Sequence, residues 1–168
     1  MAGPDAVHDS FTLERIYPTA TPARTFAAWS TEAGRSAWFS TPNNELWDMT
    51  DRHFDFRIGG SEVLEGRWKS GVVSRFDATY HDIVPDRRIV YAYRMRIDGK
   101  PISVNLACVE FHPHDDGTRL VLTEHGIYLD GFEDGGGRAH GTGELLDRLG
   151  VALGVARPDG TPEWEACH

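Results

Sequence analysis

Apolar and polar positions alternate through the middle of the chain, in four consecutive runs that are separated by short turns. The runs are Phe76 to Tyr80, Ile89 to Ile97, Ile102 to Phe111 and Leu120 to Tyr128. A period of two over neighbouring runs predicts an antiparallel sheet with one face in water and one face covered. The positions predicted for the covered face are rich in Tyr, Trp, Phe and Met. A sheet lined in this way, with a helix to cover it, favours a cupped binding cavity.

The segment before these runs predicts one strand, two short helices and two further strands, and the first run lies within a third strand. The first strand ends at Tyr17, because Pro18 cannot continue a hydrogen-bonded ladder. Thr21 before Pro22 is typical of a helix N-terminus, and Thr31 indicates a second one. The predicted elements are a strand 10–17, helices 22–29 and 31–38, a loop 40–50 with one buried Trp, and strands 53–58, 61–69 and 72–84.

The turn between the two long strands at 89–97 and 102–111 sets which side chains share a face. With Gly99 and Lys100 as its central residues, the large apolar side chains fall on one face, which is the arrangement that burial selects. The predicted pairs are Ile97 with Ile102, Met95 with Val104, Tyr93 with Leu106, and Tyr91 with Cys108.

Beyond Tyr128 the apolar spacing changes from two to the period of a helix. From about Arg138, apolar positions recur as far as Leu153, and Gly154 is a plausible stop. This long helix is expected to cover the sheet, after an acidic, glycine-rich loop at 130–137 that is a candidate gate. The prediction is one α+β domain of about seven strands over residues 8–154, with flexible ends at 1–7 and 155–168.

Composition narrows the classes of partner. The chain has 168 residues and a net charge of -9, so its field opposes nucleic acid and anionic membrane surfaces. No apolar run reaches the length of a membrane span, and no targeting segment is recognisable, which makes the cytoplasm the default location. The two cysteines form neither a disulfide framework nor a metal knuckle, and Cys108 is expected to be a small core residue.

Seven short motifs in a fixed order carry a resemblance to a known family. They are Phe11–Arg15, Thr21–Trp29, Trp38–Phe39, Asp55–Gly60, Tyr80–Tyr91, Asp116–Glu124 and Gly141–Leu149. Together they span about Phe11 to Leu153. The chain thereby resembles the superfamily of START and birch-pollen-allergen-like domains, the helix-grip fold. Within it, the chain is similar to the branch containing the C-terminal domain of the heat-shock protein 90 ATPase activator.

The resemblance implies a curved sheet that encloses a cavity with its C-terminal helix. Such scaffolds serve lipid carriers, cyclases, hydrolases and co-chaperones, so the family alone does not choose a function. The family commonly has Gly-Trp at the start of the last helix, whereas Gly141 is followed here by Thr142. More room, or a polar group, is expected there. Only about ten residues precede the first strand, where the activator has a separate domain, which argues against stimulation of the chaperone.

The sequence shows no signature of a nucleophile, a metal set or a cofactor site. His112 and His114 could ligate a metal from a turn, but their acidic neighbours favour a solvated loop. Glu124 is the candidate acid or base: if it faces the covered side, it is a carboxyl group in apolar surroundings and its pKa is raised. The alternative is an ordinary surface glutamate at a strand end. Arg15 is expected either at the rim or paired with Glu110, Glu124 or an acidic ligand.

The predicted ligand-binding residues share an inner-face position or a place on the covering helix. They are Trp38, Phe56, Trp68, Phe76, Tyr80, Tyr91, Tyr93, Met95, Leu106, Cys108, Glu124, Thr142, Leu145 and Leu149.

Three functions are consistent with this pattern. The first is binding of a small hydrophobic molecule, aromatic and phenolic or polyketide-like. The second is an enzyme of the cyclase or hydrolase type, with Glu124 or Tyr93 as acid or base. The third is a co-chaperone-like role with a protein partner, and an exposed edge strand could also support a homodimer.

Overall fold

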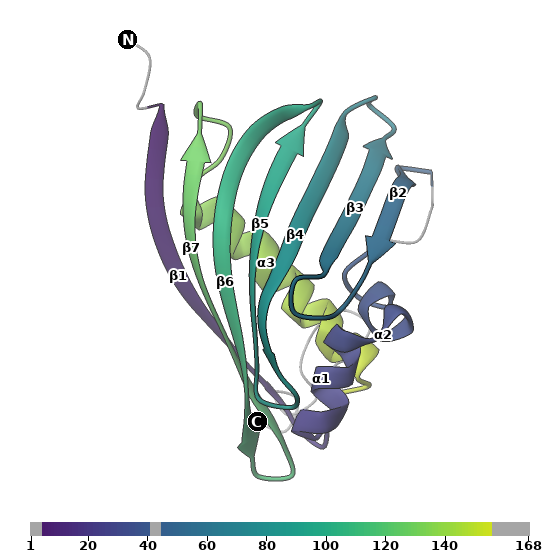
Figure 1. Cartoon of the computed structure of the whole chain (residues 1–168). Helices are drawn as coiled ribbons and strands as arrows, with labels where there is room; N and C mark the ends of the chain where they lie inside the picture. The colour runs from purple at the N-terminus through teal and green to yellow at the C-terminus, as the bar shows by residue number, and fades with distance from the viewer. Residues whose placement is uncertain (1–4, 41–44, 156–168) are drawn as a thin grey trace, which may run out of the picture.

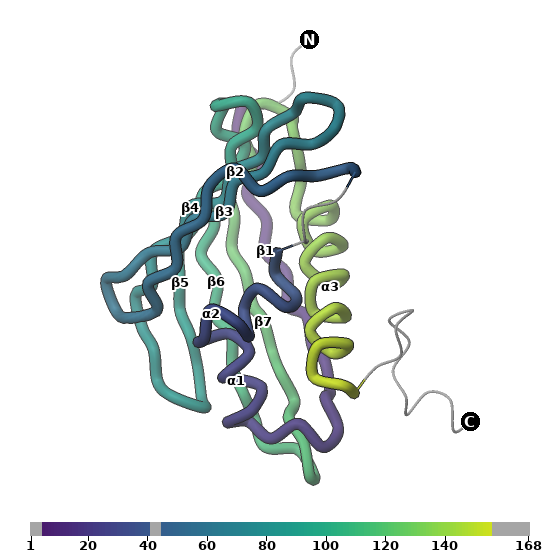
Figure 2. The backbone as a smooth tube through the Cα atoms, turned by 90° about the vertical axis from the view of Figure 1, so that its right-hand side faces the viewer, coloured from purple at the N-terminus to yellow at the C-terminus, as the bar shows by residue number. Residues whose placement is uncertain are grey.

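The computed structural model describes residues 5–40 and 45–155. Seven antiparallel strands form one sheet in the order β1-β7-β6-β5-β4-β3-β2. The long helix α3 lies across one face of this curved sheet (Figures 1 and 2). The short helices α1 and α2 lie beside the C-terminal end of α3. The elements are β1 (Ala6–Tyr17), α1 (Pro22–Ser30), α2 (Glu32–Ser36), β2 (Trp47–Phe54), β3 (Ser61–Trp68), β4 (Val73–Val84), β5 (Arg88–Ile97), β6 (Lys100–His114), β7 (Gly117–Leu129) and α3 (Gly135–Ala152). The α+β helix-grip architecture expected from the sequence is confirmed.

Local signals position the helices. Thr21 Oγ1 accepts a hydrogen bond from the Arg24 amide at 3.2 Å, with Pro22 in the first turn, as predicted. Thr31 caps α2 in the same way, although α2 ends at Ser36 rather than near Trp38. The helix α3 begins at Gly135, earlier than expected, because the Asp134 carboxylate accepts from the Gly137 amide at 2.7 Å. The glycine-rich loop therefore contributes the first turn of α3.

The edge strand β2 corrects one prediction. Residues 47–50, expected within a loop, form the start of β2, and the strand ends at Phe54 instead of Ile58. Trp47 pairs with Trp68, and a bulge follows Met49. An edge strand with one wet face carries many polar residues, which in the sequence resemble a loop. The first part of the predicted loop, residues 41–44, lies outside the described residues.

The turn between β5 and β6 corrects a second prediction. Its central residues are Asp98 and Gly99, both with positive φ, as in the two-residue hairpin turn that matches the twist of the strands. Ile97 therefore pairs with Lys100 instead of Ile102, two residues from the expected register, and a bulge between Met95 and Arg96 leaves a difference of one residue beyond it. A shift of one residue exchanges the two faces of a strand. Tyr93 thus pairs with Asn105 and Tyr91 with Ala107, while Leu106 and Cys108 face outward.

The predicted flexible ends, 1–7 and 155–168, fall mostly outside the described residues. Within the described part, Ala6 and Val7 pair with Leu129 and Tyr128, and Val155 is buried. No helix among the described residues is long and apolar enough to cross a membrane.

Candidate functional site

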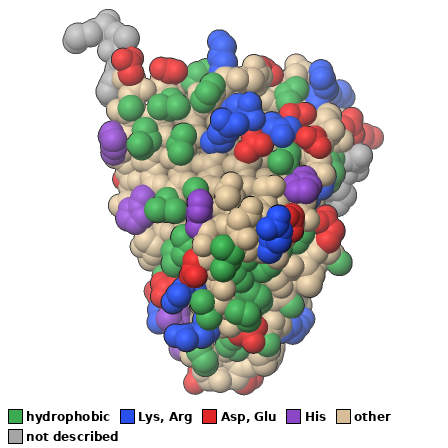
Figure 3. Space-filling view, in the orientation of Figure 1, with side chains coloured by type: hydrophobic (Ala, Val, Ile, Leu, Met, Phe, Trp, Pro, Cys, Tyr) green, Lys and Arg blue, Asp and Glu red, His purple; other side chains and the backbone are tan. Residues whose placement is uncertain are grey.

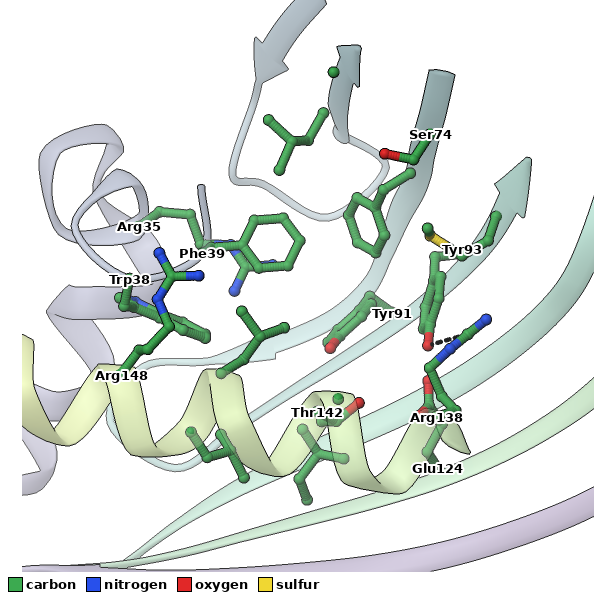
Figure 4. A pocket seen from close by; sticks show the side chains of 18 of the residues that line it. Arg35, Trp38, Phe39, Ser74, Tyr91, Tyr93, Glu124, Arg138, Thr142 and Arg148 are labelled. Carbon is green, nitrogen blue, oxygen red and sulfur yellow. Dashed lines mark hydrogen bonds between the residues drawn. The ribbon is translucent and has the colours of Figure 1, made fainter. Parts of the chain in front are cut away.

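A cavity of about 460 Å³ lies between the inner face of the sheet and helices α2 and α3. Its walls are mainly apolar and rich in aromatic side chains, and the close view in Figure 4 shows Trp38, Phe39, Tyr91 and Tyr93 around it. The aromatic residues that line it are Trp29, Trp38, Phe39, Trp47, Trp68, Phe76, Tyr91 and Tyr93. Alternation along β4 and β5 brings Phe76, Tyr91 and Tyr93 to the same face.

Nine of the predicted ligand-binding residues line this cavity. They are Trp38, Trp68, Phe76, Tyr91, Tyr93, Met95, Glu124, Thr142 and Leu145. Trp68 lies at the rim, with 45% of its side chain exposed. Thr142 reaches the cavity from α3 (Figure 4), and Gly141 beside it also lines the wall.

Five predicted residues lie elsewhere. Phe56 and Tyr80 pack edge to face in the core beneath α1, with ring centroids 4.9 Å apart. Leu149, a residue of α3, is fully buried in the core. Leu106 and Cys108 are on the outer face, and Leu106 is 47% exposed. The bulge between Met95 and Arg96, beyond the Asp98–Gly99 turn, leaves the one-residue register difference that turns both residues outward, so Cys108 is not the core residue that the sequence suggested.

One end of the cavity contains a buried ion-pair network that the sequence did not reveal. Arg35, from α2, donates to Glu62 of β3 through Nε, at 3.0 Å from Oε2, and through Nη2, at 2.9 Å from Oε1. Tyr80 and Arg52 also donate to the same carboxylate, at 2.9 and 2.8 Å. Burial raises the pKa of Glu62, but Arg35 and Arg52 outweigh it and hold that pKa below its usual range.

Aromatic rings hold the Arg35 guanidinium in place. Its central carbon lies 3.7 Å from the ring centroid of Phe39 and 4.9 Å from those of Trp29 and Trp38. Only 2% of Arg35 is exposed, and its Nη1 atom has no hydrogen-bond partner among the described residues. Arg148, on α3, lies on the same side of the pocket in Figure 4.

The other end of the cavity is organised by Arg138 in the first turns of α3. Its Nη1 donates to the Tyr93 hydroxyl at 2.8 Å and to Asn105 at 3.1 Å. Its Nη2 donates to Ser103 at 2.9 Å, and Glu133 accepts from both Nε and Nη2. All five N–H groups of this guanidinium therefore have acceptors. Arg138 ties α3 to β5 and β6 and keeps no donor for a ligand.

Glu124 faces the cavity from β7 beside this cluster. It pairs with Phe11 of β1 and Ala107 of β6, so its neighbours on the sheet are apolar. The side chain is 2% exposed, and Oε2 has no hydrogen-bond partner among the described residues. Burial raises the pKa of Glu124 to about 7, against the opposing effects of Tyr93 and Arg138. The alternative of a surface glutamate at a strand end is excluded by this position.

Two other candidate groups do not join the site. Arg15 forms a salt bridge with Asp147 of α3, at 2.8 Å, rather than with Glu110 or Glu124, so it fastens the helix to the edge strand β1. His112 and His114 lie in the β6–β7 hairpin and approach Glu110 and Asp115 at 3.4 and 3.7 Å. Across residues 5–40 and 45–155, no group of three or more His, Cys, Asp or Glu side chains is placed to hold a metal ion.

Sequence reasoning missed the charged residues Arg35, Glu62 and Arg138. A signal was present for Glu62, which shares its strand face with the inward Leu64 and Gly66. Arg35 and Arg138 lie on helices, where a long cationic side chain normally indicates a position exposed to solvent. Only the tertiary contacts distinguish them from surface arginines.

The sequence profile of the family described as activator of Hsp90 ATPase homolog 1-like proteins matches residues 19–154. The chain belongs to this family. No curated protein matches the chain. The fold of the family is generally a ligand-binding fold, in agreement with the cavity beneath α3.

Solved structures similar to the chain include two from rhizobia. A protein from Rhizobium loti is 40% identical, with a TM-score of 0.80, and the match covers 88% of this chain and 98% of that one. A putative uncharacterized protein from Rhizobium leguminosarum is 38% identical, with a TM-score of 0.81, over 88% and 95% of the two chains. A protein of unknown function from Staphylococcus aureus shares the fold at 16% identity, with a TM-score of 0.70, over 89% and 95% of the two chains.

Proposed function

We propose that this protein binds a small hydrophobic, aromatic molecule in the cavity between its sheet and α3. The observation that carries the proposal is the cavity of about 460 Å³, which is lined mainly by apolar side chains, many of them aromatic, and has charged groups at its two ends. A volume of this size is typical of sites for small organic ligands.

The arrangement of the walls favours a ring system over a long acyl chain. Phe76 and Tyr93 have ring centroids 4.9 Å apart and tilted planes, and Phe39 meets Phe76 edge to face at 5.0 Å. Rings in a ligand continue such contacts with offset or edge-to-face geometry. Phenolic and polyketide-like molecules combine rings with the few polar atoms that the two ends can hold.

A thermal-shift screen tests the proposal. The purified protein is heated with aromatic acids, flavonoid-like phenols, polyketide fragments and fatty acids. Binding to the folded state raises Tm, and we expect the aromatic classes to raise it most. The variant Thr142→Trp fills the cavity from α3 and should abolish the shift. Val151→Trp adds the same ring to an exposed position of α3, 37% exposed in the native protein, and should keep the shift. Equal shifts with both variants, or none with any aromatic compound, would exclude the proposal.

An enzyme of the cyclase or hydrolase type is the second candidate. It is favoured by Glu124, a buried carboxyl group with a raised pKa that faces a ligand-sized cavity. Incubation with each ligand from the screen, followed by mass analysis, distinguishes the two functions. A change in the mass of the ligand that Glu124→Gln abolishes would indicate catalysis.

A co-chaperone-like role with a protein partner is a third candidate, and a homodimer would use the same kind of surface. Val104, Leu106 and Ile127 are exposed on the outer face of the sheet, where Figure 3 shows apolar side chains together. Leu106→Gln would weaken binding to a protein partner and leave binding in the cavity unchanged. Sedimentation of both forms would reveal a dimer.

A further inference from the structure

The cavity leaves two buried polar atoms without partners among the described residues, and they lie at opposite sides of it. Nη1 of Arg35 is a charged donor, and Oε2 of Glu124 is a carboxyl oxygen. Both side chains are only 2% exposed, and both line the cavity. Figure 4 shows Arg35 at the α2 side and Glu124 at the side where α3 begins.

Each unpartnered atom implies a group on the ligand. A buried donor or acceptor without a hydrogen bond costs about 1–3 kcal/mol, and more when it is charged. A ligand that offers an acceptor to Arg35 and a hydroxyl to Glu124 removes both costs. Arg138 cannot serve in this way, since all five of its N–H groups already have acceptors.

The charge balance at the Arg35 end favours an anion. Arg35 and Arg52 share the single buried carboxylate of Glu62, and the second carboxylate near Arg52, that of Glu32, is 3.5 Å away and 57% exposed. Arg148 adds a further guanidinium at this side and donates to the Ser40 carbonyl oxygen at 3.3 Å. Among the described residues it makes no ion pair. Positive charge thus exceeds negative charge here, although the whole chain carries -9.

We propose that the cavity takes an aromatic acid with a hydroxyl group at the end opposite its carboxylate. The carboxylate lies against Nη1 of Arg35, and the hydroxyl lies against Oε2 of Glu124. The rings between them contact Phe39, Phe76 and Tyr91. The inference rests on the proposed function and specifies the class and the orientation of its ligand. The guanidinium of Arg35 suits this task because Phe39 and Glu62 already fix its plane.

The test compares three forms of one aromatic acid. Calorimetric titration at neutral pH uses a hydroxynaphthoic acid with its two groups at opposite ends, the same acid without the hydroxyl, and the methyl ester of the hydroxy acid. The series is repeated with para-hydroxycinnamic acid, cinnamic acid and methyl para-hydroxycinnamate, to sample a smaller ring system. We expect loss of the hydroxyl and esterification each to weaken binding by about tenfold or more. The comparison of acid with ester tests the contact with Arg35 without replacing this residue. A substitution of Arg35 would also disturb the core that it supports.

Variants assign the hydroxyl contact. Glu124→Leu should remove the preference for the hydroxylated acid and keep the preference for acid over ester. The control Glu144→Leu makes the same change at an exposed position of α3, 68% exposed in its side chain, and should keep both preferences. A hydroxyl preference that persists in Glu124→Leu overturns the assignment.

Two failures are distinguishable. If the acid, its ester and the compound without the hydroxyl all bind equally well, this inference is overturned and the proposed function remains. Absence of binding by every form, neutral esters included, removes the proposed function and the inference with it.

Discussion

The carboxylate of Glu62 receives the guanidinium of Arg35 in a two-pronged contact, with Nε 3.0 Å from Oε2 and Nη2 2.9 Å from Oε1. The pair joins the short helix α2 to β3 across the end of the cavity, and neither side chain is more than 2% exposed. It fixes the wall against which a ligand would lie.

Glu62→Gln should destabilise the protein strongly. The substitution leaves the Arg35 charge buried without its counter-charge, and loss of one member of a buried pair costs about 3–5 kcal/mol. The free energy of unfolding in urea measures the effect. Asp55→Asn is the control, because its pair with Arg57, at 2.8 Å, is exposed at the surface and should contribute less than about 1 kcal/mol. Similar losses in both variants would contradict the assigned role.

The raised pKa of Glu124 predicts a pH-dependent stability. Between the ordinary value of 4.5 and the folded value of about 7, the native protein keeps a proton that the unfolded chain releases. The contribution of Glu124 to stability is therefore complete below the lower value and falls as pH rises to about 7, by up to about 3 kcal/mol. The neighbouring Tyr93 and Arg138 keep their charge states through this range, because both pKa values are raised.

Urea unfolding of the native protein and of Glu124→Gln, over about pH 5 to 8, measures this dependence. The native protein should lose stability relative to the variant as pH rises, because glutamine does not titrate. Parallel curves would show that Glu124 ionises normally.

Two glycines that line the cavity should respond oppositely to alanine. A Cβ atom on Gly66 would lie 1.9 Å from Cε2 of Trp47, so Gly66→Ala should lower stability by about 1–3 kcal/mol through overpacking. A Cβ on Gly141 meets no atom within 4 Å, and alanine in a helix interior favours folding by about 1 kcal/mol over glycine. Thermal unfolding of the two variants compares them, and a stabilising Gly66→Ala would contradict the packing.

The register of β6 predicts unequal effects for two leucines. Leu106→Ala should change the free energy of unfolding by less than about 1 kcal/mol, because the side chain is 47% exposed on the outer face. Leu122→Ala, at 2% exposure beside the cavity, should cost about 2–5 kcal/mol. A large loss at Leu106 would support the register with Gly99 and Lys100 at the turn centre.

The elements with strong local signals were predictable. Alternation is regular along β7 and along β4 as far as Tyr80, and the caps at Thr21 and Thr31 accept the backbone hydrogen bonds that such residues favour. The strand β2 was missed in part, because its outer side chains are polar and its bulge interrupts the alternation. The inward position of Glu124 followed from alternation, while its pKa shift required the burial that β1 and β6 provide.

By itself, the sequence determined the order of the elements, the aromatic character of the inner face and the family resemblance, because these depend on the spacing of side chains along the chain. The tertiary structure alone decided which residues meet at the cavity. The turn at Asp98–Gly99 together with the bulge beside Met95 placed Leu106 outward, and packing between elements brought Arg35, Glu62 and Arg138 inward. Because side chains on a strand alternate with a period of two, the face that each one occupies depends on the register. A buried arginine is stable only beside charge and hydrogen-bond partners, and most of those of Arg35 and Arg138 come from other elements of the fold.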